Sequence, residues 1–214
     1  MDPGVIRRLG ELGVATVHEA LGRQGLLDPV VRPIYPGARA AGTAVTVCCP
    51  AGDNLMIHAA LQVVARGDVL VVTTEPPSTY GMFGDVLGTS CQALGVAGLV
   101  IDAGIRDTEE LERMAFPAWA RATSAQGTVK VAPGIVNAPI VCAGADVRPG
   151  DVVVADRDGV VIVPRERAAE AAELGEQRRD REIEYRRRLA GGELTLDVLD
   201  LRRTLREIGM DRLD

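Results

Sequence analysis

The chain has 214 residues, a length that is most simply explained by one domain with a substantial core. Hydrophobic residues make up 47% of it and charged residues 25%, as in ordinary globular proteins, and the formal net charge of -6 argues against a protein that binds nucleic-acid phosphates. No apolar run approaches the length of a membrane span. We therefore expect a cytoplasmic protein with neither a nucleic-acid nor a membrane partner.

The beginning of the chain predicts a short helix and then a strand. Thr16 and Glu19 have the spacing of a capping box, and a following glycine, Gly22 or Gly25, would end the helix that they open. An apolar run between two turn-like segments predicts a strand around Thr43–Cys49.

Helices and strands then alternate. Apolar residues at helical spacing predict an amphipathic helix over residues 53–67, and the wholly apolar run 69–74 predicts a strand that is covered on both faces. A second helix is predicted over 86–95, a second buried strand over 97–102 and a third helix over 106–114. This alternation indicates an α/β protein with layered sheets.

The rest of the chain is rich in strands and then highly charged. Residues 116–125 are predicted to be irregular or strand-like, and two apolar runs joined across residues 156–159 predict a β-hairpin. We expect residues 1–163 to form one catalytic α/β domain. Residues 164–214 are helical in pattern but too polar to bury much of themselves in that domain, so we expect them to pack on a neighbouring subunit.

The cysteines and histidines predict neither a disulfide nor a cysteine- or histidine-rich metal site. No two cysteines form a CxxC pair and all lie in apolar segments, as expected of buried free thiols in a reducing compartment. The two histidines, His18 and His58, are too few and too far apart to bind a metal together.

Two glycine-containing loops each end in an aspartate and lead into a predicted helix. Asp85 follows Gly84 and is placed to cap the helix of residues 86–95, while Asp107 and Glu110 have the spacing of an acidic capping box. Capping is thus one explanation for each aspartate. Loops at the ends of buried strands in an α/β protein also tend to converge on one crevice, so we expect the two aspartates to share a site.

The residue types at these loops suit carbon–carbon cleavage beside a 2-oxo acid. The turn over residues 84–87 places the amides of Val86 and Leu87 at a helix N-terminus, where they could receive an anion. Arg106 can bind a carboxylate through two parallel hydrogen bonds and can stabilise a developing enolate. An aspartate can hold a hard divalent cation whose other positions are filled by water.

Asn54 and His58 lie four residues apart and therefore share one face of their predicted helix. They could reach the distal carboxylate of a dicarboxylic or tricarboxylic substrate. A histidine with a purely structural role is the alternative.

Several segments along nearly the whole chain resemble one enzyme family: FGDVLGTS, GLVIDAGIRD, FPAWARATSAQGTVK, NAPIVCAGADVRPGDVVVADRDGVVIVP and LAGGELTLD. They resemble the 4-hydroxy-4-methyl-2-oxoglutarate / 4-carboxy-4-hydroxy-2-oxoadipate aldolases, within the ribonuclease E regulator A-like (RraA-like) superfamily. The most specific element is an aspartate followed, after twenty intervening residues, by Arg-Asp. Asp85 and the pair Arg106–Asp107 fit that spacing.

The resemblance implies a layered β/β/α swivelling-type fold and a homo-oligomer, a trimer or a hexamer of stacked trimers. It implies a class II pyruvate aldolase that uses Mg²⁺ or Mn²⁺ and a small 2-oxo di- or tricarboxylic acid, with oxaloacetate decarboxylation as a further activity. Asp107 would be the direct metal ligand, and Arg106 would bind the oxo-acid and steady the enolate. Asp85 would hold a metal-bound water or orient Arg106, and the amides of Gly84–Leu87 would receive the pyruvyl carboxylate.

The resemblance also implies a glutamate from the C-terminal segment of a neighbouring subunit near the waters of the metal. Its position in the sequence favours Glu182, with Glu184 as the other candidate. The alternative for either residue is a surface glutamate that pairs with arginines of its own helix.

Two other readings of the same residues are open. A Schiff-base aldolase would have to use Lys130, the only lysine of the chain, but nothing in its sequence neighbourhood activates it, so metal catalysis is preferred. A related group of non-enzymatic proteins binds and inhibits ribonuclease E. Those regulators lack the aspartate of the Arg-Asp pair, whereas Asp107 is present here, which favours the enzyme.

Overall fold

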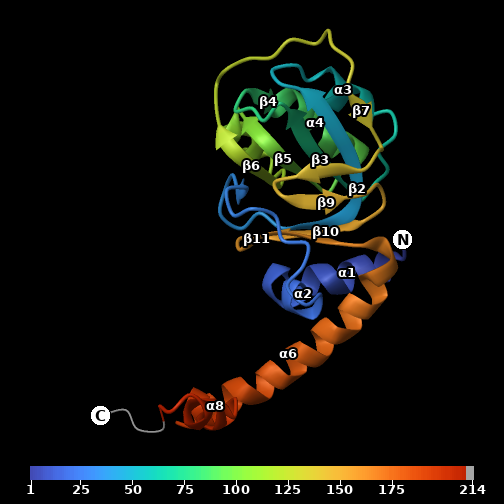
Figure 1. The fold of residues 1–214 in the computed structure, drawn as a ribbon. Helices are drawn as coiled ribbons and strands as arrows, with labels where there is room; N and C mark the ends of the chain where they lie inside the picture. Colours follow the sequence, from blue (N-terminus) through green and yellow to red (C-terminus); the bar gives the residue numbers. More distant parts are fainter. Residues whose placement is uncertain (211–214) are drawn as a thin grey trace. The chain divides into compact units, whose positions relative to one another are not determined.

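The computed structural model describes residues 1–210, which divide into two units (Figure 1). The first spans Met1–Gly175 and the second begins at Glu176. The compact first unit thus extends beyond residue 163, because Ala168, Ala171 and Ala172 at the start of the long helix are buried in one of its cores.

The first unit contains most of the helices and all of the strands that the structure describes within residues 1–210. Its helices are α1 (Pro3–Leu12), α2 (Val14–Ala20), α3 (Leu55–Ala60), α4 (Asp85–Leu94), α5 (Thr108–Arg113) and, after a 3-10 turn over Arg165–Arg167, the start of α6 (Ala168–Ala190). Its strands are β1 (Arg32–Pro33), β2 (Ala40–Pro50), β3 (Asp68–Glu75), β4 (Gly81–Phe83), β5 (Gly98–Ile105), β6 (Ala118–Thr123), β7 (Ile135–Val136), β8 (Ile140–Cys142), β9 (Ala145–Val147), β10 (Val152–Asp156) and β11 (Gly159–Val163).

A mixed sheet organises the first unit, with the strand order β1-β6-β5-β3-β2-β10-β11, β4 beside β5 and β7 beside β2. The central strands β2, β3, β5 and β6 are parallel, and a helix lies between each consecutive pair along the chain. Strands β8 and β9 form a separate antiparallel pair. The fold is therefore a layered α/β fold, as expected from the alternation in the sequence.

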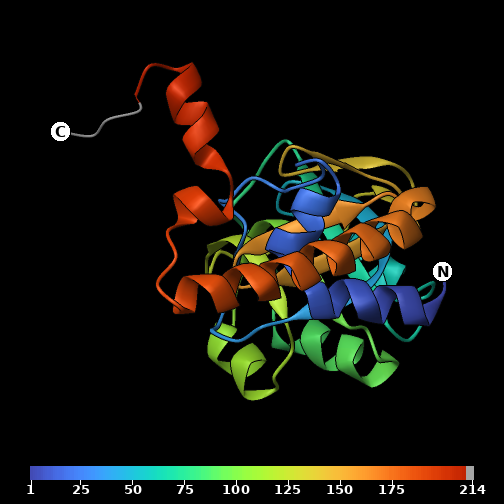
Figure 2. The same cartoon turned by 90° about the horizontal axis from the view of Figure 1, so that it is seen from below.

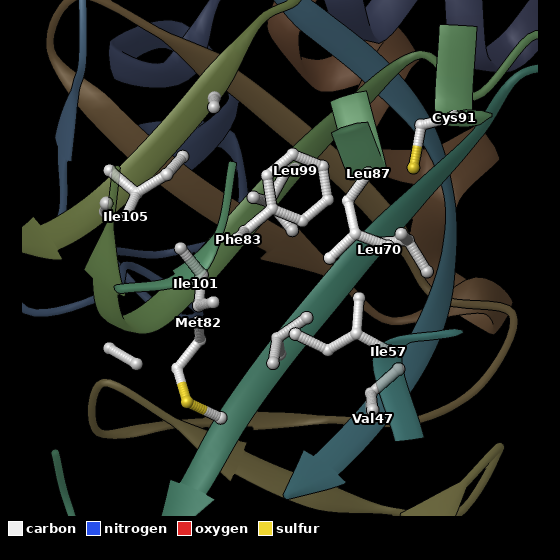
Figure 3. Packing of buried hydrophobic residues seen from close by; sticks show 14 of the residues in the cluster. Val47, Ile57, Leu70, Met82, Phe83, Leu87, Cys91, Leu99, Ile101 and Ile105 are labelled. Atoms are coloured by element: carbon white, nitrogen blue, oxygen red, sulfur yellow. The ribbon is translucent and has the colours of Figure 1, made fainter. Parts of the chain in front are cut away.

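The central strands are buried on both faces because their alternating side chains enter different cores. Leu70 and Val72 of β3 pack with the apolar sides of α3, α4 and α5, in the core drawn in Figure 3. Val69 and Val71 face the opposite core with Trp119. The wholly apolar run predicted to be a covered strand is confirmed.

A third core joins β10 and β11 to α1, α2 and the first turns of α6. Figure 1 shows α1 and α2 on the outer side of this hairpin. The hairpin itself is confirmed, with Asp156 paired to Gly159 at its turn.

Two local predictions were wrong or incomplete. The helix predicted over residues 53–67 ends at Ala60 as α3, and Val63 is 51% exposed in the turns that follow. Thr16 does not cap α2, which begins at Val14 after Gly13. Of the two alternatives given for residues 116–125, the strand is confirmed by β6.

The four cysteines of the chain are confirmed as free and buried: Cys48, Cys49, Cys91 and Cys142. Burial raises the pKa of the Cys91 thiol to about 12, so this thiol stays protonated and unreactive near neutral pH.

The second unit consists of helices. The part of α6 that follows Glu176 is succeeded by α7 (Thr195–Val198) and α8 (Leu201–Glu207), and ion pairs join neighbouring turns, such as Arg187 with Glu184. Within the described residues, no helix is both long and apolar enough to cross a membrane.

Candidate active site

The two aspartate loops lie side by side because β4 pairs with the end of β5. The pairing is parallel and matches Gly81 with Gly104 and Phe83 with Ile105. The backbone N–H of Arg106 continues the ladder by donating to the carbonyl oxygen of Phe83 at 2.9 Å. The segments that follow β4 and β5 therefore leave the sheet at the same position along the strands, and each enters a helix there.

Glycines permit this close approach of backbones. A β-carbon on Gly104 would lie 2.2 Å from the carbonyl oxygen of Thr79, and one on Gly81 would lie 2.4 Å from that of Ser124. Neither contact is sterically possible, so β4 can pair here only because both positions are glycine.

Helices α4 and α5 begin at these two loops and pack against each other. Figure 2 shows them side by side, and the side-chain amide of Gln92 on α4 donates to the carbonyl oxygen of Met114 just after α5, at 2.8 Å. Two helix N-termini and the ends of two parallel strands thus meet at one edge of the sheet, where ligands of α/β proteins commonly bind.

At this junction Asp107 contacts both neighbouring candidates. Its Oδ2 lies 3.4 Å from the backbone nitrogen of Asp85 and 3.3 Å from Nε of Arg106. The side chains of Arg106 and Asp107 are 46% and 35% exposed, so both can still meet a ligand. Asp107 also has a backbone φ of 54°, an uncommon value for a residue other than glycine.

The capping roles predicted for the aspartates are only partly confirmed. Gly84 is the N-cap of α4 and Asp85 is its first residue, with Oδ1 accepting from the backbone N–H of Val86 at 2.8 Å. Asp107 does occupy the N-cap position of α5, but its carboxylate makes no capping hydrogen bond and turns toward Asp85 instead. Capping therefore does not explain why an aspartate stands at this position.

A cavity of about 290 Å³ opens beside the junction. The residues that line it come from the β4–α4 turn, from α3 and its start, from the end of β5 and from the loop after β6: Asn54, His58, Gly81, Met82, Phe83, Gly84, Asp85, Val86, Leu87, Arg106, Gly127, Thr128 and Lys130. The structure thus brings together all the residues predicted to bind substrate, with Asp107 adjoining them through Arg106 and Asp85.

The α3 side of the cavity carries polar atoms with unused hydrogen-bonding capacity. Asn54 is 5% exposed and donates through Nδ2 to the carbonyl oxygen of Met82 at 2.8 Å, but its Oδ1 has no partner among residues 1–210. The buried Nε2 of His58 also lacks one there. Buried polar atoms usually have partners, so these two atoms are exceptions and leave hydrogen-bonding capacity beside the cavity.

Burial, and secondarily the charge of Lys130, lower the pKa of His58 from its ordinary value. The imidazole is therefore neutral at pH 7 and can donate one hydrogen bond and accept another.

Lys130 itself lines the cavity, although its sequence context suggested only the Schiff-base alternative. It stands on the loop between β6 and β7, far along the chain from Asn54 and His58. A lone lysine in a glycine-containing loop was the only signal available in the sequence.

The donor atoms at the junction fit a hard divalent cation. Asp107 and Asp85 each have one carboxylate oxygen with no hydrogen bond or ion pair to the described residues. No group of three or more potential metal-ligating side chains occurs in the part of the chain that the structure describes. A cation that keeps most of its waters and takes one or two carboxylates, as Mg²⁺ does, suits such a donor set.

The two glutamates predicted to serve a neighbouring site lie in the second unit and are paired on their own helix. Glu182 pairs with Arg178 at 2.9 Å and Arg186 at 3.4 Å, and Glu184 pairs with Arg187. These pairs are the surface arrangement given as the alternative. The role of Glu182 at the metal of a neighbouring subunit stays a prediction.

The fold and the junction of the two loops together define an α/β protein with a candidate ligand site at the carboxyl ends of its parallel strands. Residues 14–162 match the family model described as RraA-like: Aldolase/RraA, and the chain belongs to this RraA-like family. Three relatives illustrate its range. A protein of Halalkalibacterium halodurans named "Putative 4-hydroxy-4-methyl-2-oxoglutarate aldolase" is 34% identical over 70% of this chain and 71% of its own. A protein of Burkholderia mallei with the same name is 33% identical over 67% of this chain and 86% of its own.

The third relative is a solved structure. Streptomyces coelicolor RraAS2, described as an unusual member of the RNase ES inhibitor RraA protein family, superposes with a TM-score of 0.77. It is 28% identical, and the match covers 87% of this chain and 97% of that one. The family therefore includes proteins named as aldolases and proteins named as ribonuclease inhibitors.

Proposed function

We propose that this protein is a divalent-metal-dependent, class II pyruvate aldolase. It cleaves 4-carboxy-4-hydroxy-2-oxoadipate or 4-hydroxy-4-methyl-2-oxoglutarate to pyruvate and a second oxo-acid, and it decarboxylates oxaloacetate at the same site. The observation that carries the proposal is the meeting of Asp85, Arg106 and Asp107 at one edge of the cavity. The names of the two aldolase-like relatives support the same chemistry.

The substrate's 2-oxo-carboxylate end binds at the start of α4. The amides of the first helical turn have no backbone partners within the helix and favour an anion, and Arg106 supplies a guanidinium. The substrate carboxylate replaces the Asp85 oxygen at the N–H of Val86 and takes the N–H of Leu87 as its second donor.

Asp107 holds Mg²⁺ or Mn²⁺ at this end of the cavity, with Asp85 close enough to hold a water of the ion or to orient Arg106. When bound, the cation polarises the 2-oxo group and shares the negative charge that cleavage places on its oxygen. The fixed guanidinium of Arg106 stabilises the same charge.

The two reactions share one demanding step. Aldol cleavage removes the proton of the 4-hydroxyl group and breaks the C3–C4 bond, leaving the enolate of pyruvate. Oxaloacetate decarboxylation breaks the corresponding C3–C4 bond and leaves the same enolate with carbon dioxide. Protonation at C3 then gives pyruvate in both cases, so a site that stabilises this enolate accelerates both reactions.

The far end of the substrate lies against α3 and the loop after β6. Asn54 and the neutral His58 offer hydrogen bonds there, and Lys130 offers a positive charge to a distal carboxylate. The protein works as a homo-oligomer, a trimer or hexamer, in which Glu182 of one subunit approaches the metal waters of another.

A non-enzymatic role in binding ribonuclease E is the second candidate function, and the similarity to Streptomyces coelicolor RraAS2 favours it. Asp107 argues for the enzyme, because a protein-binding role gives no reason for a carboxylate with one oxygen unpaired among residues 1–210 beside an arginine that lines the cavity.

The proposal is tested by incubating the protein and Mg²⁺ with each of the two hydroxy-oxo-acids and with oxaloacetate. We expect pyruvate from at least one hydroxy-oxo-acid and from oxaloacetate. If none of the three yields pyruvate while the protein inhibits ribonuclease E, the second candidate function replaces the first.

A further inference from the structure

Asp53 is a buried carboxylate that stands behind the cavity wall without lining it. It is 3% exposed and accepts three backbone hydrogen bonds. Oδ1 accepts from the N–H of Leu55 at 2.9 Å, at the start of α3. Oδ2 accepts from the N–H groups of Val131 at 2.7 Å and Ala132 at 2.8 Å, on the loop between β6 and β7.

The loop that Asp53 holds forms one wall of the cavity. Its residues Gly127, Thr128 and Lys130 line the cavity, and Lys130 directly precedes the first amide that Asp53 binds. Backbone hydrogen bonds fasten the loop on the other side of Lys130, where Val129 donates to Gly52 at 2.9 Å and accepts from the N–H of Asn54 at 3.1 Å.

Apolar packing contributes little to holding this loop in place. Val129 is 57% exposed and Val131 is 79% exposed. A loop with few buried side chains opens easily unless hydrogen bonds hold it, and those made by a charged acceptor are the strongest available. The carboxylate of Asp53 therefore supplies the charge-assisted part of this loop's attachment, beside the backbone hydrogen bonds of Val129 and of Gln126, whose carbonyl oxygen accepts from the N–H of Gly81 at 2.8 Å.

We infer that Asp53 is a positioning residue, which fixes Lys130 at the cavity wall by tying its loop to the start of α3. The inference rests on the proposed function for the role of Lys130 but not for the attachment itself. Burial raises the pKa of the Asp53 carboxyl, but its three backbone hydrogen bonds and the charge of Lys130 lower it, and the net pKa lies below its ordinary value. Asp53 is thus ionised at neutral pH and serves as an acceptor at both oxygens.

The attachment is tested by cleavage at Lys130. Because Lys130 is the only lysine, a lysine-specific endoprotease cuts a chain without added lysines once, after residue 130. In Asp53→Asn one side-chain oxygen becomes an NH₂ group, which cannot accept from a backbone N–H. We expect native Asp53→Asn to be cut at least about tenfold faster than wild type.

Asp151→Asn is the matched control. Asp151 is 5% exposed and accepts from the backbone N–H groups of Arg148 at 2.8 Å and Arg165 at 3.0 Å, away from the cavity. It should lose stability like Asp53→Asn but be cut at Lys130 at the wild-type rate. Equal cleavage of wild type and Asp53→Asn would overturn the inference, as would equal acceleration in the two variants.

Hydrogen exchange of the wild-type protein tests the attachment even if Asp53→Asn does not fold. The amides of Val131 and Ala132 should exchange at least about tenfold more slowly than that of Lys130, after correction for intrinsic rates. Exchange of all three at the same rate would show that Asp53 does not hold the loop.

The positioning role is tested by kinetics with 4-carboxy-4-hydroxy-2-oxoadipate. Asp53→Asn should raise KM about tenfold and leave kcat within about threefold, because the groups at the metal end are untouched. In a Lys130→Met background the same substitution should change KM less than about twofold. A full tenfold effect in that background would show that Asp53 does not act through Lys130.

An inactive wild-type protein would refute the proposed function and, with it, the substrate-binding role assigned to Lys130. Protease cleavage and hydrogen exchange would still decide whether Asp53 holds the loop.

Discussion

Substitution of Gly84 by alanine tests how closely the two aspartate-containing loops must approach for the proposed activity. The backbone of Gly84 is extended, with φ of -153° and ψ of -168°, so alanine can adopt its conformation without strain. The added β-carbon, however, would lie 2.3 Å from Oδ2 of Asp107 and 3.2 Å from Nε of Arg106. Carbon and oxygen atoms in contact need roughly 1 Å more than the first of these distances, so Asp107 has to move by about 1 Å.

A displacement of that size is large for a catalytic group. Misplacement by about 1 Å can cost about 100-fold in rate, which corresponds to about 2.7 kcal/mol of transition-state stabilisation. We therefore expect Gly84→Ala to lower kcat/KM for pyruvate release about 100-fold.

Gly127→Ala is the control within the same cavity. Its β-carbon would meet only Nη1 of Arg106, at 3.8 Å, which is an ordinary van der Waals contact. It should keep kcat/KM within about twofold of wild type, and thermal unfolding should show that both variants are folded. Wild-type kcat/KM in folded Gly84→Ala would refute the reasoning that the contact between the loops sets the catalytic geometry.

Two further substitutions test the charges of the site. Arg106→Ala should slow both aldol cleavage and oxaloacetate decarboxylation by at least about 100-fold, because the same guanidinium stabilises the enolate of both reactions. Pyruvate release from each substrate measures this, with substitution of the exposed Arg113 by alanine as the control. Retention of either reaction would mean that another group stabilises the enolate. His58→Gln should flatten the dependence of stability on pH. Because the pKa of His58 is lowered in the folded protein, the unfolded chain binds more protons below about pH 6.5, and wild-type stability falls as the pH falls through that value toward the folded pKa. Urea unfolding at pH 7.5 and pH 5.5 measures the slope, and an equal slope in the variant would contradict the assignment.

The sequence was sufficient to predict the convergence of the two loops. The wholly apolar runs of β3 and β5 indicated parallel strands buried on both faces, and such strands place the loops at their carboxyl ends together. Asp85 and Arg106 lie at the same position along the strand direction because Phe83 in β4 pairs with Ile105 in β5. This pairing could not be predicted, because a strand of three residues leaves almost no periodic signal in the sequence.

Local patterns predicted less well where tertiary contacts override them. Asp85 was expected to cap its helix, but the N-cap is its neighbour Gly84, where an added β-carbon would lie 2.3 Å from Oδ2 of Asp107. The helical spacing of residues 53–67 continues past Ala60, but the chain turns there and α3 ends after six residues.

The attachment of the Lys130 loop was beyond the reach of the sequence. Asp53 meets Val131 and Ala132 across more than seventy residues, and a single aspartate before a helix predicts only a local hydrogen bond such as the one to Leu55. Contacts of this kind depend on which loops the fold brings together.

Metal-dependent aldol cleavage is tested by pyruvate release from 4-carboxy-4-hydroxy-2-oxoadipate, measured for wild type and Asp107→Asn before chelation, after chelation and after addition of Mg²⁺. We expect the chelator to abolish wild-type turnover and Mg²⁺ to restore it. Asp107→Asn should be inactive throughout while remaining folded. Turnover that survives chelation would contradict metal catalysis, and trapping of the substrate on Lys130 by borohydride would then identify the Schiff-base alternative.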